Sequence, residues 1–338
     1  MAYKNLIGIA CADRGEVFKR LRDFVCKRNG SYDYSLTGIG WTLFDSFYTT
    51  DQNTISINDW FVVYSPGESG NEDLYFRVTF VSNYLKIEGF LYWDAVANVG
   101  VQQYNTLANW YMTDALAPVL WVYGDLDFVL PVHRESTTSS NFYVTPFGKA
   151  ISLYNDVVAT SAAALPAAAG VIIDVGTVPV GAGWVVGKKL FIRDTAKIDI
   201  ITITAVSATT VTADLAFSYL AGAKLSADIA YYVSTGYQVM TAVNCLIAHN
   251  GAKSITVNGF SNDNAVATNC SPDSLNADHI FQNLHCSAPT YGYLGIMRHV
   301  LKGPAAGLTN LDITAHADGN NYRVFSLMSG MPILIKEV

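Results

Sequence analysis

The feature that most constrains this fold is a long succession of short β-type segments. Runs rich in Val, Ile, Thr and aromatic residues alternate with turn signals along most of the 338 residues. This pattern predicts a mainly β (α+β) protein built from antiparallel sheets or a sandwich. The predicted hairpins join residues 74–81 to 84–93, 119–123 to 128–132, and 322–325 to 332–336.

One segment has helical periodicity instead. Asp13 is a suitable N-cap and Glu16 stands three residues later, while the apolar residues from Val17 to Val25 fall on one helix face. We therefore expect a single N-terminal amphipathic helix that ends at Asn29-Gly30.

This helix also concentrates positive charge in a chain of net charge −7. Its cations are Arg14, Lys19, Arg20, Arg22, Lys27 and Arg28. As candidate assembly contacts they would steer an acidic partner toward the helix. The alternative is an ordinary solvated face. We expect Lys19, Arg20 and Arg22 to lie off the apolar stripe of the helix.

Changes in strand density predict three regions. Residues 1–158 form an N-terminal α+β sheet domain, and residues 159–233 form a small inserted β-barrel-like domain whose strands recur every 8–12 residues. The Ala-rich stretch 159–170 precedes the strands of that insertion, which begin at Val171, like a hinge. Residues 234–338 form a C-terminal β region that packs with the first domain, with a short helix expected over 273–283.

The amino-acid composition indicates which surfaces bury the excess of apolar residues. Hydrophobic residues make up 51% of the chain and charged residues only 14%, yet no stretch of about 20 apolar residues predicts a membrane span. Subunit interfaces accept such residues, because obligate interfaces are apolar, poor in charge and rich in aromatics. We therefore expect assembly with other protein copies and no membrane association. A large β core with a neutral surface is the alternative.

Several function classes receive no support from the sequence. No polybasic tail favours nucleic-acid binding, and no phosphate loop or nucleophile motif favours an enzyme or a cofactor. The N-terminus lacks the apolar run of a signal peptide, so we expect cytoplasmic assembly. We also expect five free thiols, on Cys11, Cys26, Cys245, Cys270 and Cys286.

Three groups of residues are weaker candidates for sites. His279, His285, Cys286 and His299, with Cys270 upstream, carry zinc-type ligands at irregular spacing, and core or capping roles are the alternative. Asp125 and Asp127 are expected to be turn carboxylates. A last set could form a receptor-binding surface or simply pack in the core: Tyr92, Trp93, Trp110, Tyr111 and Trp121.

Three stretches together resemble virion structural proteins of tailed bacteriophages and prophages. They are DWFVVYSPGESGNEDLYFRVTFVSNYLKIEGFLYW (59–93), FIRDTAKIDIITITAVSATTVTADLAFSYLAGAK (191–224) and DGNNYRVFSL (318–327). The middle stretch is similar to small β domains that decorate phage proteins. The resemblance implies a virion component present in several copies, with other virion proteins as partners and no catalytic motif to transfer. A neck, collar, tail or baseplate subunit remains open, as does a receptor- or glycan-binding or capsid-decoration module.

Overall fold

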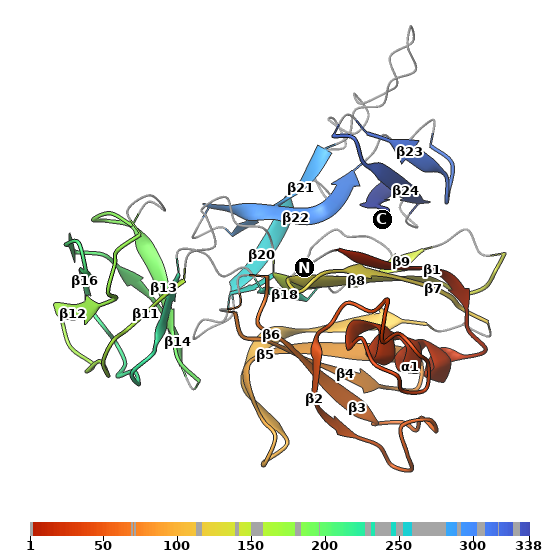
Figure 1. Ribbon diagram of the computed structural model, residues 1–338, viewed down its shortest axis with the longest axis horizontal. Coiled ribbons are helices and arrows are strands. Elements are labelled where there is room, and N and C mark those ends of the chain that lie inside the picture. The colour runs from red at the N-terminus through yellow and green to blue at the C-terminus, as the bar shows by residue number, and fades with distance from the viewer. Residues whose placement is uncertain are drawn as a thin grey trace, which may run out of the picture.

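The computed structural model confirms a mainly β fold with several antiparallel sheets and one helix near the N-terminus (Figure 1). It describes residues 3–68, 70, 72–112, 117–138, 142–149, 158–179, 184–195, 197–226, 231–233, 245–247, 253–258, 282–288, 292–302, 308–316, 318–326 and 332–338. Within this part of the chain, no helix has the length and hydrophobicity to cross a membrane.

Helix α1 (Arg14–Val25) begins at the predicted cap. The Asp13 carboxylate accepts a hydrogen bond from the Glu16 amide at 2.8 Å, and the Glu16 carboxylate accepts one from the Ala12 amide at 2.7 Å. The helix ends earlier than expected because Lys27 adopts a left-handed conformation, with φ +48°.

A five-stranded sheet follows the helix as a simple meander. Its strands are β2 (Thr42–Phe47), β3 (Trp60–Ser65), β4 (Leu74–Phe80), β5 (Tyr84–Asp94) and β6 (Val99–Tyr111), paired in sequence order. One face of this sheet joins the main hydrophobic cluster together with the apolar face of α1. The other face carries a separate, largely aromatic cluster.

A second, long sheet links the two ends of the chain. Its order is β1-β7-β8-β10-β18-β19-β20-β21-β22-β25-β24-β23, with β9 also paired to β8. Its strands are β1 (Lys4–Ala10), β7 (Val119–Gly124), β8 (Phe128–Arg134), β9 (Tyr143–Val144), β10 (Phe147–Lys149), β18 (Tyr231–Val233), β19 (Cys245–Ile247), β20 (Lys253–Asn258), β21 (Gln282–Ala288), β22 (Gly292–Lys302), β23 (Ile313–Ala315), β24 (Asn321–Ser326) and β25 (Pro332–Lys336).

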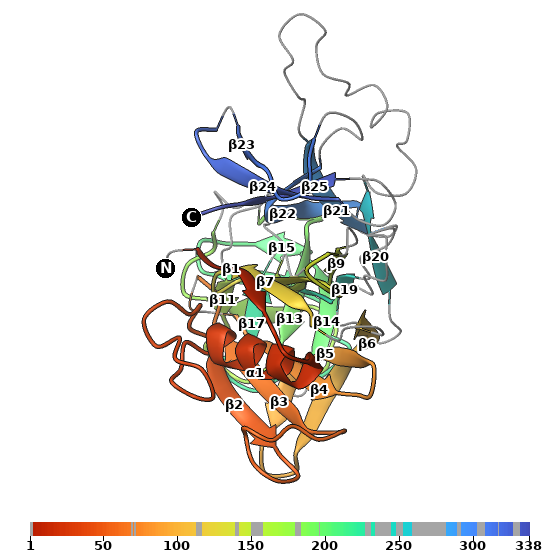
Figure 2. The same cartoon turned by 90° about the vertical axis from the view of Figure 1, so that its right-hand side faces the viewer.

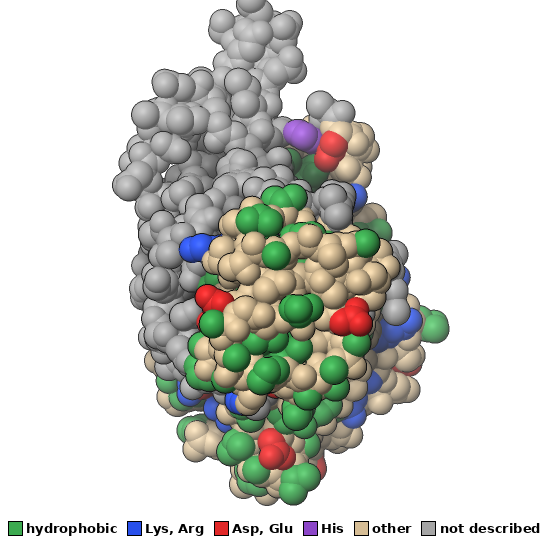
Figure 3. Space-filling model, turned by 90° about the vertical axis from the view of Figure 1, so that its left-hand side faces the viewer, with side chains coloured by type: hydrophobic (Ala, Val, Ile, Leu, Met, Phe, Trp, Pro, Cys, Tyr) green, Lys and Arg blue, Asp and Glu red, His purple; other side chains and the backbone are tan. Residues whose placement is uncertain are grey.

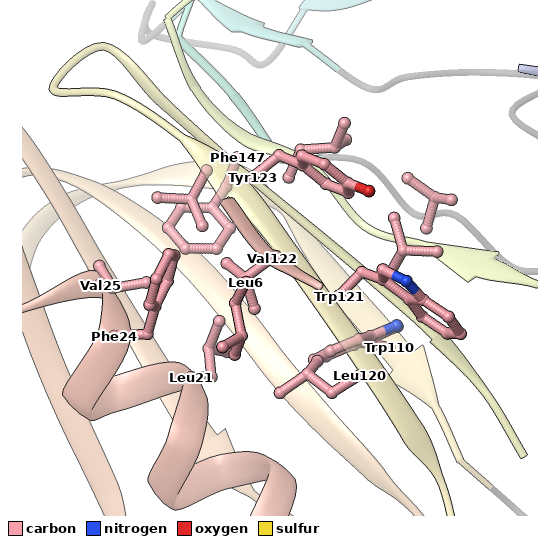
Figure 4. Close-up of a cluster of buried hydrophobic side chains, with 14 of the residues drawn as sticks. Leu6, Leu21, Phe24, Val25, Trp110, Leu120, Trp121, Val122, Tyr123 and Phe147 are labelled. Atoms are coloured by element: carbon pink, nitrogen blue, oxygen red, sulfur yellow. The ribbon is translucent and has the colours of Figure 1, made fainter. Parts of the chain in front are cut away.

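Strand β7 is buried on both faces, which explains its uninterrupted apolar sequence. Side chains of α1, β1 and β7 meet in one buried cluster (Figure 4). On the other face, the rings of Trp121 and Tyr123 lie 5.7 and 6.1 Å from Phe325 of β24. The C-terminal strands therefore cover the side of β7 that faces away from the helix (Figure 2).

The C-terminal region keeps the predicted hairpin, in which Val324 pairs with Leu334. Val300, Phe325 and Ile333 belong to the same hydrophobic cluster as the N-terminal residues. Of the short helix expected over 273–283, residues 273–281 lie outside the described residues, and Asn283 belongs to strand β21.

Residues 158–226 form a projecting lobe with a hydrophobic cluster of its own (Figure 1). Its strands are β11 (Val158–Thr160), β12 (Val171–Asp174), β13 (Lys189–Arg193), β14 (Ile198–Thr202), β15 (Ala205–Val206), β16 (Thr210–Ala213) and β17 (Lys224–Ser226). They pair as β11-β17-β13-β14 and β12-β16-β15. Among the described strands this pairing gives two separate sheets, so the barrel-like form expected for this region is not confirmed.

The lobe is inserted between two paired strands of the long sheet. Lys149 of β10 pairs with Tyr231 of β18, and the lobe's own first and last strands pair through Val158 and Ser226. Residues 231–233, which the sequence analysis placed in the insertion, therefore lie in the long sheet. That the lobe can be excised as an independent unit stays a prediction.

Candidate functional site

The six cations of the helix region do not form one open surface. Arg20 pairs with Glu16 at 2.7 Å and donates to the Tyr34 hydroxyl. Lys19 donates to the Asn53 carbonyl, and Arg28 donates to the Gln52 side chain. Arg14 approaches the Met112 carbonyl at 3.5 Å. Lys27 alone among the six is exposed.

Arg22 is fully buried, so its interpretation as a surface cation is wrong. It lies four residues after Phe18 and three before Val25, which places it on the apolar stripe itself. Its guanidinium contacts both Asp23 carboxylate oxygens at 2.8 and 3.1 Å and donates to the Gln52 carbonyl. Arg22 therefore ties the helix to the following loop. An assembly role for the other cations stays a prediction.

We expect Arg22→Lys to lower the free energy of unfolding by about 1–2 kcal/mol, because lysine cannot reproduce the bidentate contact and the bond to Gln52. Lys19→Glu, on the partly exposed side of the helix, should change it by no more than about 0.5 kcal/mol. Urea unfolding measures both variants. Equal effects at the two positions would contradict the structural role of Arg22.

The three tryptophan candidates for a receptor surface are all core residues. Trp93 and Trp110 are fully buried, and Trp121 is almost so. The side chain of Tyr111 lies outside the described residues. Tyr92 is only partly buried, and it lines the one cavity discussed below.

The His and Cys candidates are not brought together in the described part of the chain. His299 lies against the Tyr3 ring, with centroids 4.4 Å apart, and its Nε2 is 3.9 Å from an Asp125 carboxylate oxygen. The side chains of His279, His285, Cys286 and Cys270 lie outside the described residues. Among the residues that are described, no group of three potential ligands could hold a metal.

The carboxylates of the β7–β8 turn act as expected. Asp125 accepts hydrogen bonds from the amides of Asp127 and Phe128 at 2.8 and 3.3 Å, an arrangement typical of an Asx turn. Asp127 in turn accepts one from the Glu68 amide at 2.8 Å. Both carboxylates therefore stabilise loops.

Cys11 and Cys26 are free thiols, whereas the side chains of Cys245, Cys270 and Cys286 lie outside the described residues. Burial raises the pKa of both Cys11 and Cys26 to about 12, which leaves little thiolate at neutral pH.

We expect these two thiols to react with iodoacetamide at pH 8 at least a hundredfold more slowly in the native protein than after unfolding, because only the thiolate attacks. Peptide mass spectrometry over a time course measures each site separately. Alkylation of Cys11 or Cys26 at the unfolded rate would contradict their burial.

The joint between the lobe and the body contains a buried cluster of charges. Glu72 accepts from Lys149 Nζ at 2.7 Å with one carboxylate oxygen and from the Arg193 guanidinium at 3.0 Å with the other. All three side chains are at most 2% exposed. Beside them Asp73 pairs with Lys224 at 2.6 Å. Because Arg193 and Lys224 belong to the lobe, these pairs fix its orientation.

Strand β13 makes this joint possible. Leu190 and Ile192 point into the lobe's core, while Phe191 joins the main cluster of the body. Arg193 follows Phe191 on that same face because side chains alternate along a strand. The lobe therefore packs on the body through one buried face of β13.

A cavity of about 200 Å³ opens at this joint. From the body it is lined by Asp73, Tyr75 and Tyr92, at the end of the sheet face that carries the aromatic cluster. The lobe contributes Arg193, Asp194, Thr195, Leu220, Ala221, Gly222 and Lys224. Sequence reasoning singled out Tyr92 alone, since the other lining residues come from segments far apart in the chain.

Neither any protein-family model nor any curated protein matches the chain.

Proposed function

We propose that this protein is a structural component of a tailed-phage virion, a neck, collar, tail or baseplate subunit. It acts in the virion through contacts with copies of itself and with other virion proteins. It does not act as an enzyme, and it requires no cofactor, membrane or direct nucleic-acid contact.

The observation that carries this proposal is the outer surface of the lobe. The side turned away from the body is mostly uncharged, with apolar side chains spread among neutral polar ones (Figure 3). Ile172, Val185 and Val186 of the lobe are 68%, 52% and 64% exposed. Neutral, partly apolar surfaces with few charges are typical of protein interfaces.

The attachment of the lobe supports the same role. Glu72, Lys149 and Arg193 are desolvated and paired, so tilting the lobe would separate buried charges. A rigidly held lobe presents its surface in one orientation, as repeated assembly into a symmetric particle requires.

Analytical ultracentrifugation over a range of protein concentrations tests the proposal. We expect the wild-type chain to self-associate, and Val185→Lys with Val186→Lys to shift it toward monomer, because two lysines would be desolvated at the contact. Thr37→Lys with Thr50→Lys is the matched control, since it adds the same charge at exposed positions of the body.

A wild-type chain that stays monomeric at about 100 µM would contradict assembly through its own copies. Equal weakening of self-association by the lobe and body variants would show a general effect of added charge, and it would contradict a contact through the lobe surface.

A further inference from the structure

We infer that the cavity at the joint binds one pyranose ring of a neutral glycan, with the ring lying between the tyrosines of the body and the turns of the lobe. This inference is independent of the proposed assembly role, and it gives the glycan-binding alternative raised by the sequence a specific place.

The shape of the cavity sets the size of its ligand. Its volume of about 200 Å³ is below the usual range for drug-sized ligands, so it suits a single small ring. On the lobe side Gly222 has φ +82°, and a Cβ there would meet nothing within 4 Å. The turn that contains Gly222 therefore leaves the entrance open.

The body supplies flat aromatic surfaces. The rings of Tyr75 and Tyr92 lie edge to face with centroids 5.8 Å apart, and Tyr64 packs on Tyr75 at 4.8 Å. A tyrosine hydroxyl is neutral at pH 7, and burial raises the pKa of Tyr75 further above its ordinary value. A neutral phenol offers an apolar face together with a polar edge. This combination matches a pyranose, which has C–H groups on its faces and hydroxyls at its rim.

The charges around the cavity favour a neutral ligand. Two carboxylates, Asp73 and Asp194, and two cations, Arg193 and Lys224, line it. Asp73 and Lys224 already pair at 2.6 Å, and both side chains keep about a quarter of their surface exposed. Asp73 and Lys224 can therefore form hydrogen bonds to sugar hydroxyls while their own ion pair stays intact. A phosphate, in contrast, would have to compete with the carboxylates for the cations.

The floor of the cavity is preorganised. Arg193, which lines the cavity, contacts Glu72 at 3.0 Å, and Lys149 contacts Glu72 at 2.7 Å, all three side chains being buried. Fixed partners reduce the entropy lost when a ligand binds. Because the two walls belong to the body and the lobe, a bound ring would contact both.

Saturation-transfer NMR with the full chain tests this inference. The probes are methyl β-D-glucopyranoside, methyl β-D-galactopyranoside and methyl α-D-mannopyranoside, with inorganic phosphate as a competitor. We expect at least one glycoside to bind saturably with a dissociation constant in roughly the millimolar range, as a ligand of this size allows. Phosphate should not displace it.

Two variants locate the binding. Tyr92→Ala removes the stacking surface and Ala221→Trp fills the entrance, and each should weaken binding at least tenfold. Ala216→Trp, also exposed on the lobe but outside the cavity lining, should leave binding unchanged. The inference is overturned if no glycoside saturates below about 50 mM, if phosphate competes, or if both cavity variants bind as the wild type does.

Discussion

Glu72→Gln should lower the free energy of unfolding by about 3–5 kcal/mol. The substitution leaves Lys149 and Arg193 buried without the carboxylate that each contacts, at 2.7 and 3.0 Å. Removing one member of a buried ion pair is costly because the remaining charge stays desolvated. Urea unfolding followed by tryptophan fluorescence measures the change, and Trp184 is buried in the lobe itself.

Two further variants isolate the cause. Glu68→Gln removes a charge from an exposed residue four positions away, and it should change the stability by no more than about 0.5 kcal/mol. Replacing Glu72, Lys149 and Arg193 together by Leu, Met and Met removes all three buried charges, and it should recover much of the loss. A loss below about 1 kcal/mol for Glu72→Gln would mean that the cluster is not desolvated.

The second large effect is loss of stability in acid caused by His133. Its ring lies between Trp110 and Tyr143, with both centroid distances 4.9 Å, and it is fully buried. Neither ring nitrogen has a hydrogen-bond partner among the described residues. Burial lowers the pKa of His133 from 6.5 to about 3. The folded protein therefore keeps this ring neutral where the unfolded chain would protonate it.

Because the folded pKa is the lower one, the unfolded state binds the extra proton between pH 6.5 and pH 3. The free energy of unfolding should fall across that window by about 4–5 kcal/mol in total on account of this residue. His133→Phe fills the same space without a titratable group, so it should flatten the acid slope and raise stability at pH 7.

Urea midpoints between pH 3.5 and pH 7.5 measure this slope. An unchanged slope in His133→Phe would assign the acid lability to other groups.

Local patterns explain which elements could be predicted. The Asp13 cap and the alternating strands needed no distant partner, so their positions agree with the structure to within a residue or two. Strand β6 was missed because VGVQQYNTLANWY shows no alternation. Its extended conformation comes from its long pairing with β5, from Trp93 opposite Gly100 to Tyr84 opposite Tyr111.

The buried charge cluster at the joint could not be predicted either, because no local pattern marks its residues. Glu72, Lys149 and Arg193 come from three segments separated by 77 and 44 positions, and their spacing carries no motif. One local signal was present: the central residues 190–192 of the strand Lys189–Arg193, Leu-Phe-Ile, are apolar on both faces, as expected for a strand buried on both sides. The burial of Arg22 could also have been predicted from the sequence, because Arg22 lies on the same helix face as Phe18 and Val25.

The placement of the lobe between β10 and β18 has a consequence for synthesis of the chain. Lys149 pairs with Tyr231, which is 82 residues later. At ~5–20 residues per second, the outer edge of β10 waits on the order of ten seconds for its neighbour to be translated. During that interval its backbone amides and carbonyls can pair with another nascent chain. Lys149 of β10 and Arg193 of the lobe both contact Glu72, so early packing of the lobe would hold β10 in its place in the body until β18 is made.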